Sequence, residues 1–297
     1  MDSDAPGGRA DDPPSPAVTD GSTEPNTARS SDSPPAGDVD TASDATAVDP
    51  GDDAAPAVDW SRRLRHLGEV LVVLLGAYLF AGVVVSALDP VVGELAVVAA
   101  ADNGLRLVQT AVQFLAIAAV SLWYANVVAV DRLVRRALPS GRSLALIAGG
   151  TVLLVAANVG INQGLSALGF ESGENAAVTA GAGDPTYLLA MVVVSILLVG
   201  PAEELLFRGA IQGRLRQSWG PWPAILGATV LFGAIHAPAV SGTTGAVVGY
   251  LVTAAILGLL LGYLYERTDN IVVPAAIHGG NNAVVFGLLY LGEIGVL

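Results

Sequence analysis

The stretch TYLLAMVVVSILLVGPAEELL, residues 186–206, decides the fold. Most of it is apolar, and its length matches the ~20 residues that cross the hydrocarbon core of a bilayer as a helix. Near its end stand two neighbouring glutamates, Glu203 and Glu204. Ionisable side chains inside a membrane are costly, so they are functional candidates by default. The stretch therefore predicts a membrane helix that carries a functional site.

Apolar segments of similar length recur through residues 60–297, the body of the chain. The composition agrees with a membrane protein, because only 14% of the residues are charged and soluble domains carry about 25%. We predict an all-α, polytopic transmembrane helix bundle with seven spans, at roughly 69–88, 105–130, 143–162, 186–206, 222–240, 245–265 and 271–292. Segment 91–101 is apolar but too short to span. We interpret it as an interfacial or re-entrant piece, with an eighth span as the alternative.

Residues 1–59 differ from the body in charge and in composition. They hold 14 of the 27 acidic residues and only Arg9 and Arg29 as bases. Large apolar residues are almost absent before Val58, so this segment cannot bury enough surface to offset its ordering entropy. We predict a disordered acidic tail. The chain has no cysteine, which excludes disulfides and thiolate sites.

The arginines of the body predict its orientation, since loops rich in arginine stay in the cytoplasm. Eleven of the twelve fit a cytoplasmic N-terminus and seven spans, and Arg106 alone falls near an outer boundary. The eleven are Arg62, Arg63, Arg65, Arg132, Arg135, Arg136, Arg142, Arg208, Arg214, Arg216 and Arg267. We expect an integral protein of the cell membrane with its site reached from the cytoplasmic side.

Helical spacing groups the polar residues of the last spans. Glu204 and Arg208 are four apart, so they share a helix face and can pair, which favours a structural ion pair. Glu203 lies about 100° round the helix and can face the bundle interior. His236 and His278 lie in the next apolar segments, at similar depths from the arginine-rich side. A lone intramembrane histidine is usually structural, but two of them with Glu203 favour a shared site.

Three short motifs occur in order on successive apolar segments. They are Glu203-Glu204-x-x-x-Arg208, Phe232-x-x-x-His236 and His278-x-x-x-Asn282. This pattern resembles the CPBP family of intramembrane proteases, which includes the endoprotease that trims prenylated CAAX proteins and proteins linked to bacteriocin maturation and self-immunity. The resemblance covers about residues 186–292. The first three spans are similar to the family only in being hydrophobic helices.

The resemblance implies hydrolysis of a peptide bond within the membrane. Glu203 would be the base that activates water, and Arg208 would orient Glu203 and Glu204. His236 would position the water or help to bind a metal, and His278 with Asn282 would stabilise the oxyanion. Glu203, His236 and His278 would be the ligands if the site holds Zn²⁺. The motif H-E-x-x-H is absent from the sequence, and both metal-dependent and metal-free mechanisms stay open.

Other interpretations were weighed against proteolysis. The string Gly181-Ala-Gly-Asp184 is typical of intramembrane aspartyl proteases, but no second Tyr-Asp helix follows, and no Gly-x-Ser-Gly supports a serine protease. A non-proteolytic scaffold or immunity-type protein with the same fold is the main alternative. A proton or ion relay would need polar residues at several depths, and the first three spans and the sixth offer few. We expect as partners the bilayer and a membrane-associated protein or peptide, prenylated or not, and no nucleic acid.

Overall fold

The structure, a computed structural model, describes residues 58–297 except 96–102, 128–133, 136, 139 and 172. In this part of the chain, seven helices are long and apolar enough to cross a membrane. The fold is therefore the all-α polytopic bundle that the sequence predicts. The predicted acidic tail lies outside the described residues apart from its last two. The same holds for most of segment 91–101, whose residues 91–93 continue the first helix.

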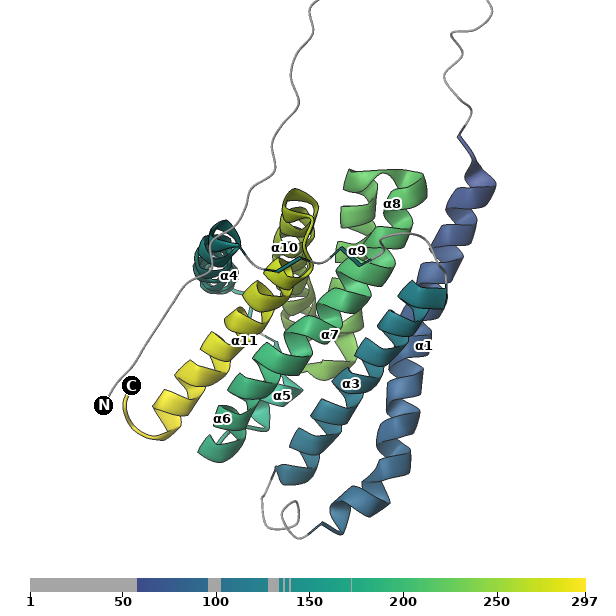
Figure 1. The fold of residues 1–297 in the computed structure, drawn as a ribbon. Coiled ribbons are helices and arrows are strands. Elements are labelled where there is room, and N and C mark those ends of the chain that lie inside the picture. Colours follow the sequence, from purple (N-terminus) through teal and green to yellow (C-terminus); the bar gives the residue numbers. More distant parts are fainter. Residues whose placement is uncertain (1–57, 96–102, 128–133, 136, 139, 172) are drawn as a thin grey trace, which may run out of the picture. The chain divides into compact units, whose positions relative to one another are not determined.

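The seven helical stretches follow one another along the chain (Figure 1). The first three are α1 (Trp60–Gly93), α3 (Gly104–Val127) and α4 (Gly141–Ala167). The fourth is a continuous run of α6 (Pro185–Val194), η1 (Ser195–Val199), α7 (Gly200–Glu204), η2 (Leu205–Gln212) and α8 (Gly213–Trp219). The last three are α9 (Pro221–Ile235) with η3 (Ala237–Ala239), α10 (Thr244–Thr268) and α11 (Val272–Glu293).

Several helices extend beyond the predicted spans, because a helix continues past its apolar part. Trp60, the first residue of α1, lies well before the predicted start at 69, and the added turns carry Arg62, Arg63 and Arg65. The side chain of Asp59 caps this helix by accepting a hydrogen bond from the backbone N–H of Arg62 at 2.9 Å. The fourth stretch continues to Trp219 rather than ending near 206.

Hydrogen bonds define which helix ends lie together. At one end, which we call the arginine-rich end, Arg63 of α1 donates to the carbonyl of Ser218 in α8, and Arg216 of α8 pairs with Glu266 of α10. At the other, which we call the far end, Asn103 before α3 donates to the carbonyl of Ala180 and to Asp184 before α6. Gly183 donates there to Glu293 at the end of α11.

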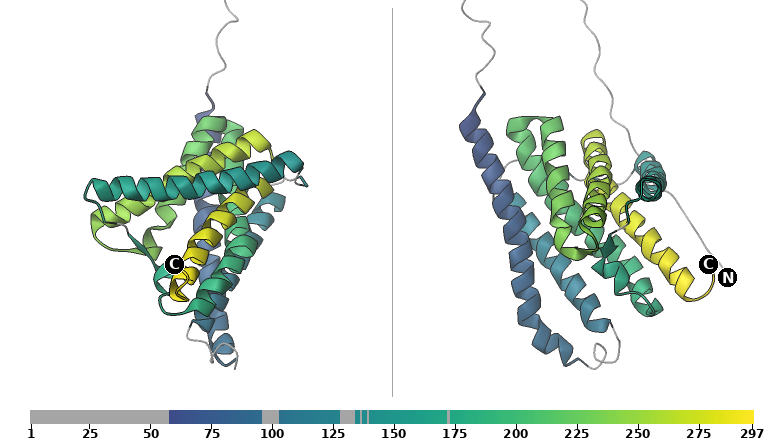
Figure 2. Two further views of the ribbon diagram at one scale, coloured as in Figure 1. Left: turned by 90° about the vertical axis from the view of Figure 1, so that its left-hand side faces the viewer. Right: turned by 180° about the vertical axis from the view of Figure 1, so that it is seen from behind.

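The helices around the site pack in two groups. α3, the α6–α8 run and α11 lie side by side, and α10 packs against α9 (Figure 1). α4 contacts α10 and α11 and runs across them at a steep angle (Figure 2). The main apolar core joins α1, α3, α7, η2, α8 and α9 around Leu206, Phe207 and Ile211, which are all fully buried.

Two short antiparallel β-strands pair with each other and link two of the loops between helices. β1 (Glu174–Asn175) pairs with β2 (Val240–Ser241), with Glu174 opposite Ser241 and Asn175 opposite Val240. β1 leads into the one-turn helix α5 (Ala176–Thr179), whose N-terminus is capped by the side chain of Asn175. Because β2 follows directly after α9 and η3, the ladder places the 174–179 connection next to the end of α9.

Candidate active site

Glu203 and Glu204 end the short helix α7, which lies between two π-helical segments, η1 and η2. A π-helix closes its hydrogen bonds over five residues instead of four, and such segments are frequently found at functional sites. Both glutamates are buried, with Glu203 5% and Glu204 0% exposed. The sequence predicted two carboxylates inside the membrane. That prediction assumed an ideal α-helix, and nothing in the residue spacing indicated the π-helical turns.

Glu204 and Arg208 form the ion pair that their spacing predicted. The Nε of Arg208 lies 3.1 Å from Oε2 of Glu204. Arg208 also donates from Nη2 to the carbonyl oxygen of Gly258 at 2.7 Å, and its guanidinium lies 4.8 Å from the ring centre of Phe232. Gly258 permits this approach, because a Cβ there would lie 2.9 Å from Phe232. These contacts hold the Glu204 carboxylate in place from behind.

His278 lies between the two glutamates. Its Nδ1 is 3.0 Å from Oε1 of Glu204, so a proton on Nδ1 donates to that carboxylate. Its Nε2 lies 3.6 Å from Oε2 of Glu203. The backbones of the two helices meet here, because a Cβ on Gly200 would lie 2.7 Å from the backbone nitrogen of Gly279. The glycine after the histidine therefore lets α11 bring the imidazole to both carboxylates.

His236 follows the last residue of α9 and faces the same region. Its Nδ1 lies 2.7 Å from the carbonyl oxygen of Phe232. A carbonyl only accepts, so Nδ1 carries a proton, and in the neutral ring Nε2 keeps its lone pair. The rings of His236 and His278 lie 4.9 and 5.7 Å from that of Phe232. The contact holds the ring of His236, and in its neutral form Nε2 can accept a hydrogen bond.

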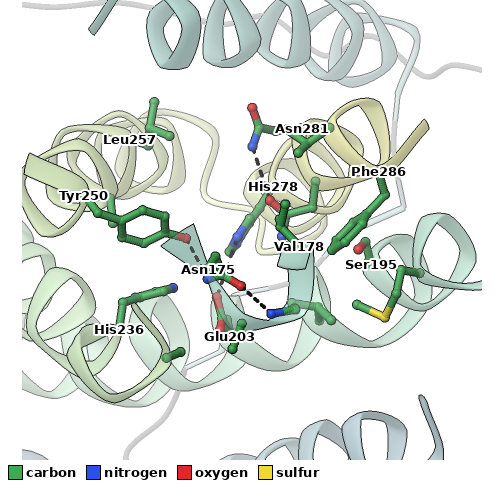
Figure 3. A pocket seen from close by; sticks show the side chains of 18 of the residues that line it. Asn175, Val178, Ser195, Glu203, His236, Tyr250, Leu257, His278, Asn281 and Phe286 are labelled. Atoms are coloured by element: carbon green, nitrogen blue, oxygen red, sulfur yellow. Dashed lines mark hydrogen bonds and ion pairs between the residues drawn. The ribbon is translucent and has the colours of Figure 1, made fainter. Parts of the chain in front are cut away.

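Most of the predicted site residues line one cavity of about 840 Å³ (Figure 3). Four of the six predicted site residues line it, namely Glu203, His236, His278 and Asn282. Glu204 and Arg208 are not among its lining residues, so they form a supporting layer behind Glu203 and His278. The structure thus brings the three motifs together at one place. Four of their residues face the cavity, and the other two contact those residues from outside it.

Some polar residues of the cavity were missed by the sequence reasoning. Asn175 lies over the site and donates to the hydroxyl of Tyr250 at 2.9 Å (Figure 3). Asn281, beside the predicted Asn282, donates to it at 3.2 Å. Asn158 and Asn162 of α4 also line the cavity. Two asparagines four apart in an apolar span are a signal that could have found them, whereas nothing local pointed to Asn175.

The cavity extends from Glu203 towards the far end of the bundle. Its lining there includes Arg106 and Thr110 at the start of α3, Tyr187 at the start of α6, and the connection 173–179. The predicted access from the cytoplasmic side stays a prediction. The depth comparison made from the sequence predicted similar distances of the three groups from the arginine-rich end, and it contained no signal for the direction in which their cavity continues.

The predicted zinc ligands are only partly assembled. The 3.6 Å between Nε2 of His278 and Oε2 of Glu203 is compatible with two ligands of one ion. However, among residues 58–297, with the gaps named above, no three His, Cys, Asp or Glu side chains are grouped closely enough to hold a metal. His236 is therefore not placed as the third ligand, and we derive no step through a metal.

Comparison with family models agrees with the motifs. Residues 185–284 match the model described as type II CAAX prenyl endopeptidase, Rce1-like. The match begins with α6, includes all six predicted site residues, and confirms the resemblance to the CPBP and CAAX protease family. Neither the comparison with curated proteins nor that with solved structures found a match.

Proposed function

We propose that this integral membrane protein, whose residues 185–284 carry an Rce1-like domain, is an endopeptidase in which Glu203 activates the attacking water. The observation that carries the proposal is the position of Glu203. Its carboxylate lines a cavity of about 840 Å³ between membrane helices, next to His278 and together with His236. A carboxylate and two histidines that line one cavity are suited to general base catalysis.

The first step needs a water held between an acceptor and a base. The free Nε2 of His236 accepts one hydrogen bond of the water and orients it. Glu203 takes the proton as the water oxygen attacks the carbonyl carbon of the substrate. His278 keeps Glu203 in position, because its own orientation is fixed by Glu204 and, through Glu204, by Arg208.

The second step stabilises the oxyanion and releases the products. The side-chain amide of Asn282 is a candidate donor to the oxyanion, since its Oδ1 already accepts from Asn281. His278 is the second candidate donor, through Nε2 when that atom carries a proton. Glu203 then returns its proton to the leaving nitrogen, and the carbon–nitrogen bond breaks. In this scheme Glu203, His236, His278 and Asn282 touch the reacting atoms, whereas Glu204 and Arg208 act as positioning residues.

For the substrate we propose a membrane-associated protein, prenylated or not, and for the location the cell membrane with a cytoplasmic N-terminus. The mixed lining of the cavity supports such a substrate, because apolar residues such as Leu154, Leu257 and Phe286 alternate with amides. The test incubates the membrane-embedded protein with a library of prenylated and unprenylated peptides, and mass spectrometry reads the new termini. Termini made by wild type and lost in Glu203→Gln support proteolysis. Identical termini from both folded proteins would favour the scaffold.

A relay for protons is the second candidate, favoured by one observation. Polar groups continue from Glu204 and Arg208 to Gln212, which donates to Glu266 at 3.1 Å near the arginine-rich end. Purified protein in vesicles with a pH-sensitive dye inside would distinguish the two functions. Proton flux that Gln212→Leu abolishes would support the relay, and absence of flux together with cleavage would support the protease.

A further inference from the structure

The side chain of Asn175 makes two hydrogen bonds that fix the orientation of its amide. Its oxygen accepts from the backbone N–H of Ala177 at 2.9 Å, which caps the one-turn helix α5. A backbone N–H only donates, so the amide atom that faces it is the oxygen. The other amide atom, which lies 2.9 Å from the hydroxyl of Tyr250, is therefore the nitrogen. Asn175 thus donates to Tyr250 and does not accept from it.

This direction decides where the proton of the Tyr250 hydroxyl points. A tyrosine hydroxyl carries one proton that it can donate and lone pairs that accept. One lone pair accepts from Asn175, so the proton is directed away from Asn175. Tyr250 is half-buried and lines the cavity that contains Glu203, and Figure 3 shows its hydroxyl pointing from α10 into that cavity. The proton can therefore be donated to a group held in the cavity.

Tyr250 lies close to the residues of the first two motifs. Its ring centre is 6.2 Å from that of His236, and its hydroxyl interacts electrostatically with Glu203. His278 and Asn282 line the same cavity from α11, whereas Tyr250 belongs to α10. A carbonyl oxygen placed in this cavity can therefore be approached by donors from two different helices.

The connection that carries Asn175 is held against the start of α10. Asn175 pairs with Val240 of β2. Two residues before it, a Cβ on Gly173 would lie only 2.9 Å from the carbonyl oxygen of Ala246, which is one turn before Tyr250 on α10. Because glycine permits this close approach, the amide of Asn175 has a fixed position relative to Tyr250. The hydroxyl is therefore oriented before any substrate enters.

We propose that Tyr250 is a further catalytic residue, whose hydroxyl donates a hydrogen bond to the carbonyl oxygen of the scissile bond, and that Asn175 positions this hydroxyl. The inference rests on the proposed function, because it takes the attacking water to be activated by Glu203. As the water oxygen bonds to the carbonyl carbon, the π electron pair moves to the carbonyl oxygen, where negative charge develops. A donor that already points at this oxygen stabilises the charge without reorganisation. Tyr250 keeps its own proton, and the proton of the water goes to Glu203.

The first measurement is cleavage by the purified protein in nanodiscs. Tyr250→Phe removes only the hydroxyl, and we expect kcat to fall about 10²-fold. KM should change little, because the hydrogen bond strengthens only as charge develops in the transition state. Tyr263→Phe is the matched control and should keep the wild-type rate, since Tyr263 lies on the same helix, is 40% exposed and does not line the cavity.

Asn175→Asp separates the positioning role of Asn175 from a structural one. The carboxylate keeps an acceptor for the N–H of Ala177, and aspartate caps a helix as well as asparagine does. It replaces the amide donor by a second acceptor, so the proton of Tyr250 turns towards it and away from the cavity. We expect the same loss of kcat as for Tyr250→Phe, an unchanged thermal midpoint, and no further loss when the two variants are combined. A further loss in the combined variant would show that the added charge acts on its own, which would overturn the positioning role.

A second readout does not depend on cleavage. Peptides of the library are labelled with ¹³C at one backbone carbonyl at a time and added to Glu203→Gln, and infrared spectroscopy records the labelled band. Loss of a hydrogen bond raises the carbonyl frequency, so adding Tyr250→Phe should shift the band of one carbonyl to higher wavenumber, and adding Tyr263→Phe should not. If no band shifts, or if Tyr250→Phe cleaves at the wild-type rate, the proposal is overturned. A shifted band together with a wild type that does not cleave would contradict the protease function and leave the contact of Tyr250 standing.

Discussion

The buried pair of Glu204 and Arg208 gives the sharpest prediction for stability. Both side chains are essentially inaccessible, at 0% and 1% exposed, so water cannot screen either charge if its partner is removed. Arg208→Met would leave the Glu204 carboxylate without its ion pair and the carbonyl of Gly258 without its donor. Breaking a buried pair in this way costs about 3–5 kcal/mol. We expect the free energy of unfolding to fall by that amount.

The measurement is unfolding in mixed micelles by titration with a denaturing detergent. Arg65→Met is the matched control, because Arg65 forms an exposed pair with Glu69 at the same spacing of four, and such pairs contribute about 0.5 kcal/mol or less. The double variant Glu204→Gln with Arg208→Met should be more stable than Arg208→Met alone, since the uncompensated charge is gone. A loss below about 1 kcal/mol for Arg208→Met would refute this reasoning.

Two further variants test the helix contact at the site and the cap of α6. Gly279→Ala places a Cβ 2.7 Å from the carbonyl oxygen of Ser195, so it should lower the free energy of unfolding by about 1–3 kcal/mol and slow cleavage. Gly287→Ala is the control, because a Cβ there has nothing within 4 Å, and it should leave stability unchanged. Equal thermal midpoints for the two variants would contradict the close contact at Gly279. The backbone N–H of Tyr187 and the side chain of Asn103 hold the pKa of Asp184 below its usual range. The ionised carboxylate of Asp184 therefore stabilises the fold fully at pH values above the ordinary carboxyl pKa. This stabilisation is lost as the pH falls through the lowered pKa of the folded state. Asp184→Ala should therefore lower stability by about 1 kcal/mol near neutral pH and by less in acid, and a loss that did not change with pH in thermal melts would exclude this role.

Much of the fold follows from the sequence, because a bilayer imposes a length and a polarity on each span. The run 186–206 has both, and the structure places a membrane helix there. The sequence could not show that this helix continues to Trp219 or that π-helical segments interrupt it. It also could not predict the crosswise path of α4, since the direction of a helix is set by its neighbours and not by its own periodicity.

The candidate site was predicted in part for a similar reason. Residues four apart on a helix share a face, so the pairing of Glu204 with Arg208 could be predicted locally. The position of His278 between the glutamates depends instead on the contact of Gly279 with the η1 backbone, which joins distant segments. Asn175 comes from a connection whose place is fixed by its pairing with β2. Such long-range contacts leave no periodic signal in the chain.

The most direct test of the central claim is the rate at which Glu203→Gln cleaves a peptide that the wild type cuts. Glutamine keeps the shape of the side chain and cannot accept the proton of the water. We predict a loss of about 10²–10⁴-fold with an unchanged thermal midpoint, and no loss for the matched control Glu171→Gln, an exposed residue that does not line the cavity. A folded Glu203→Gln that retained its rate within about tenfold would contradict the assignment of Glu203 as the base.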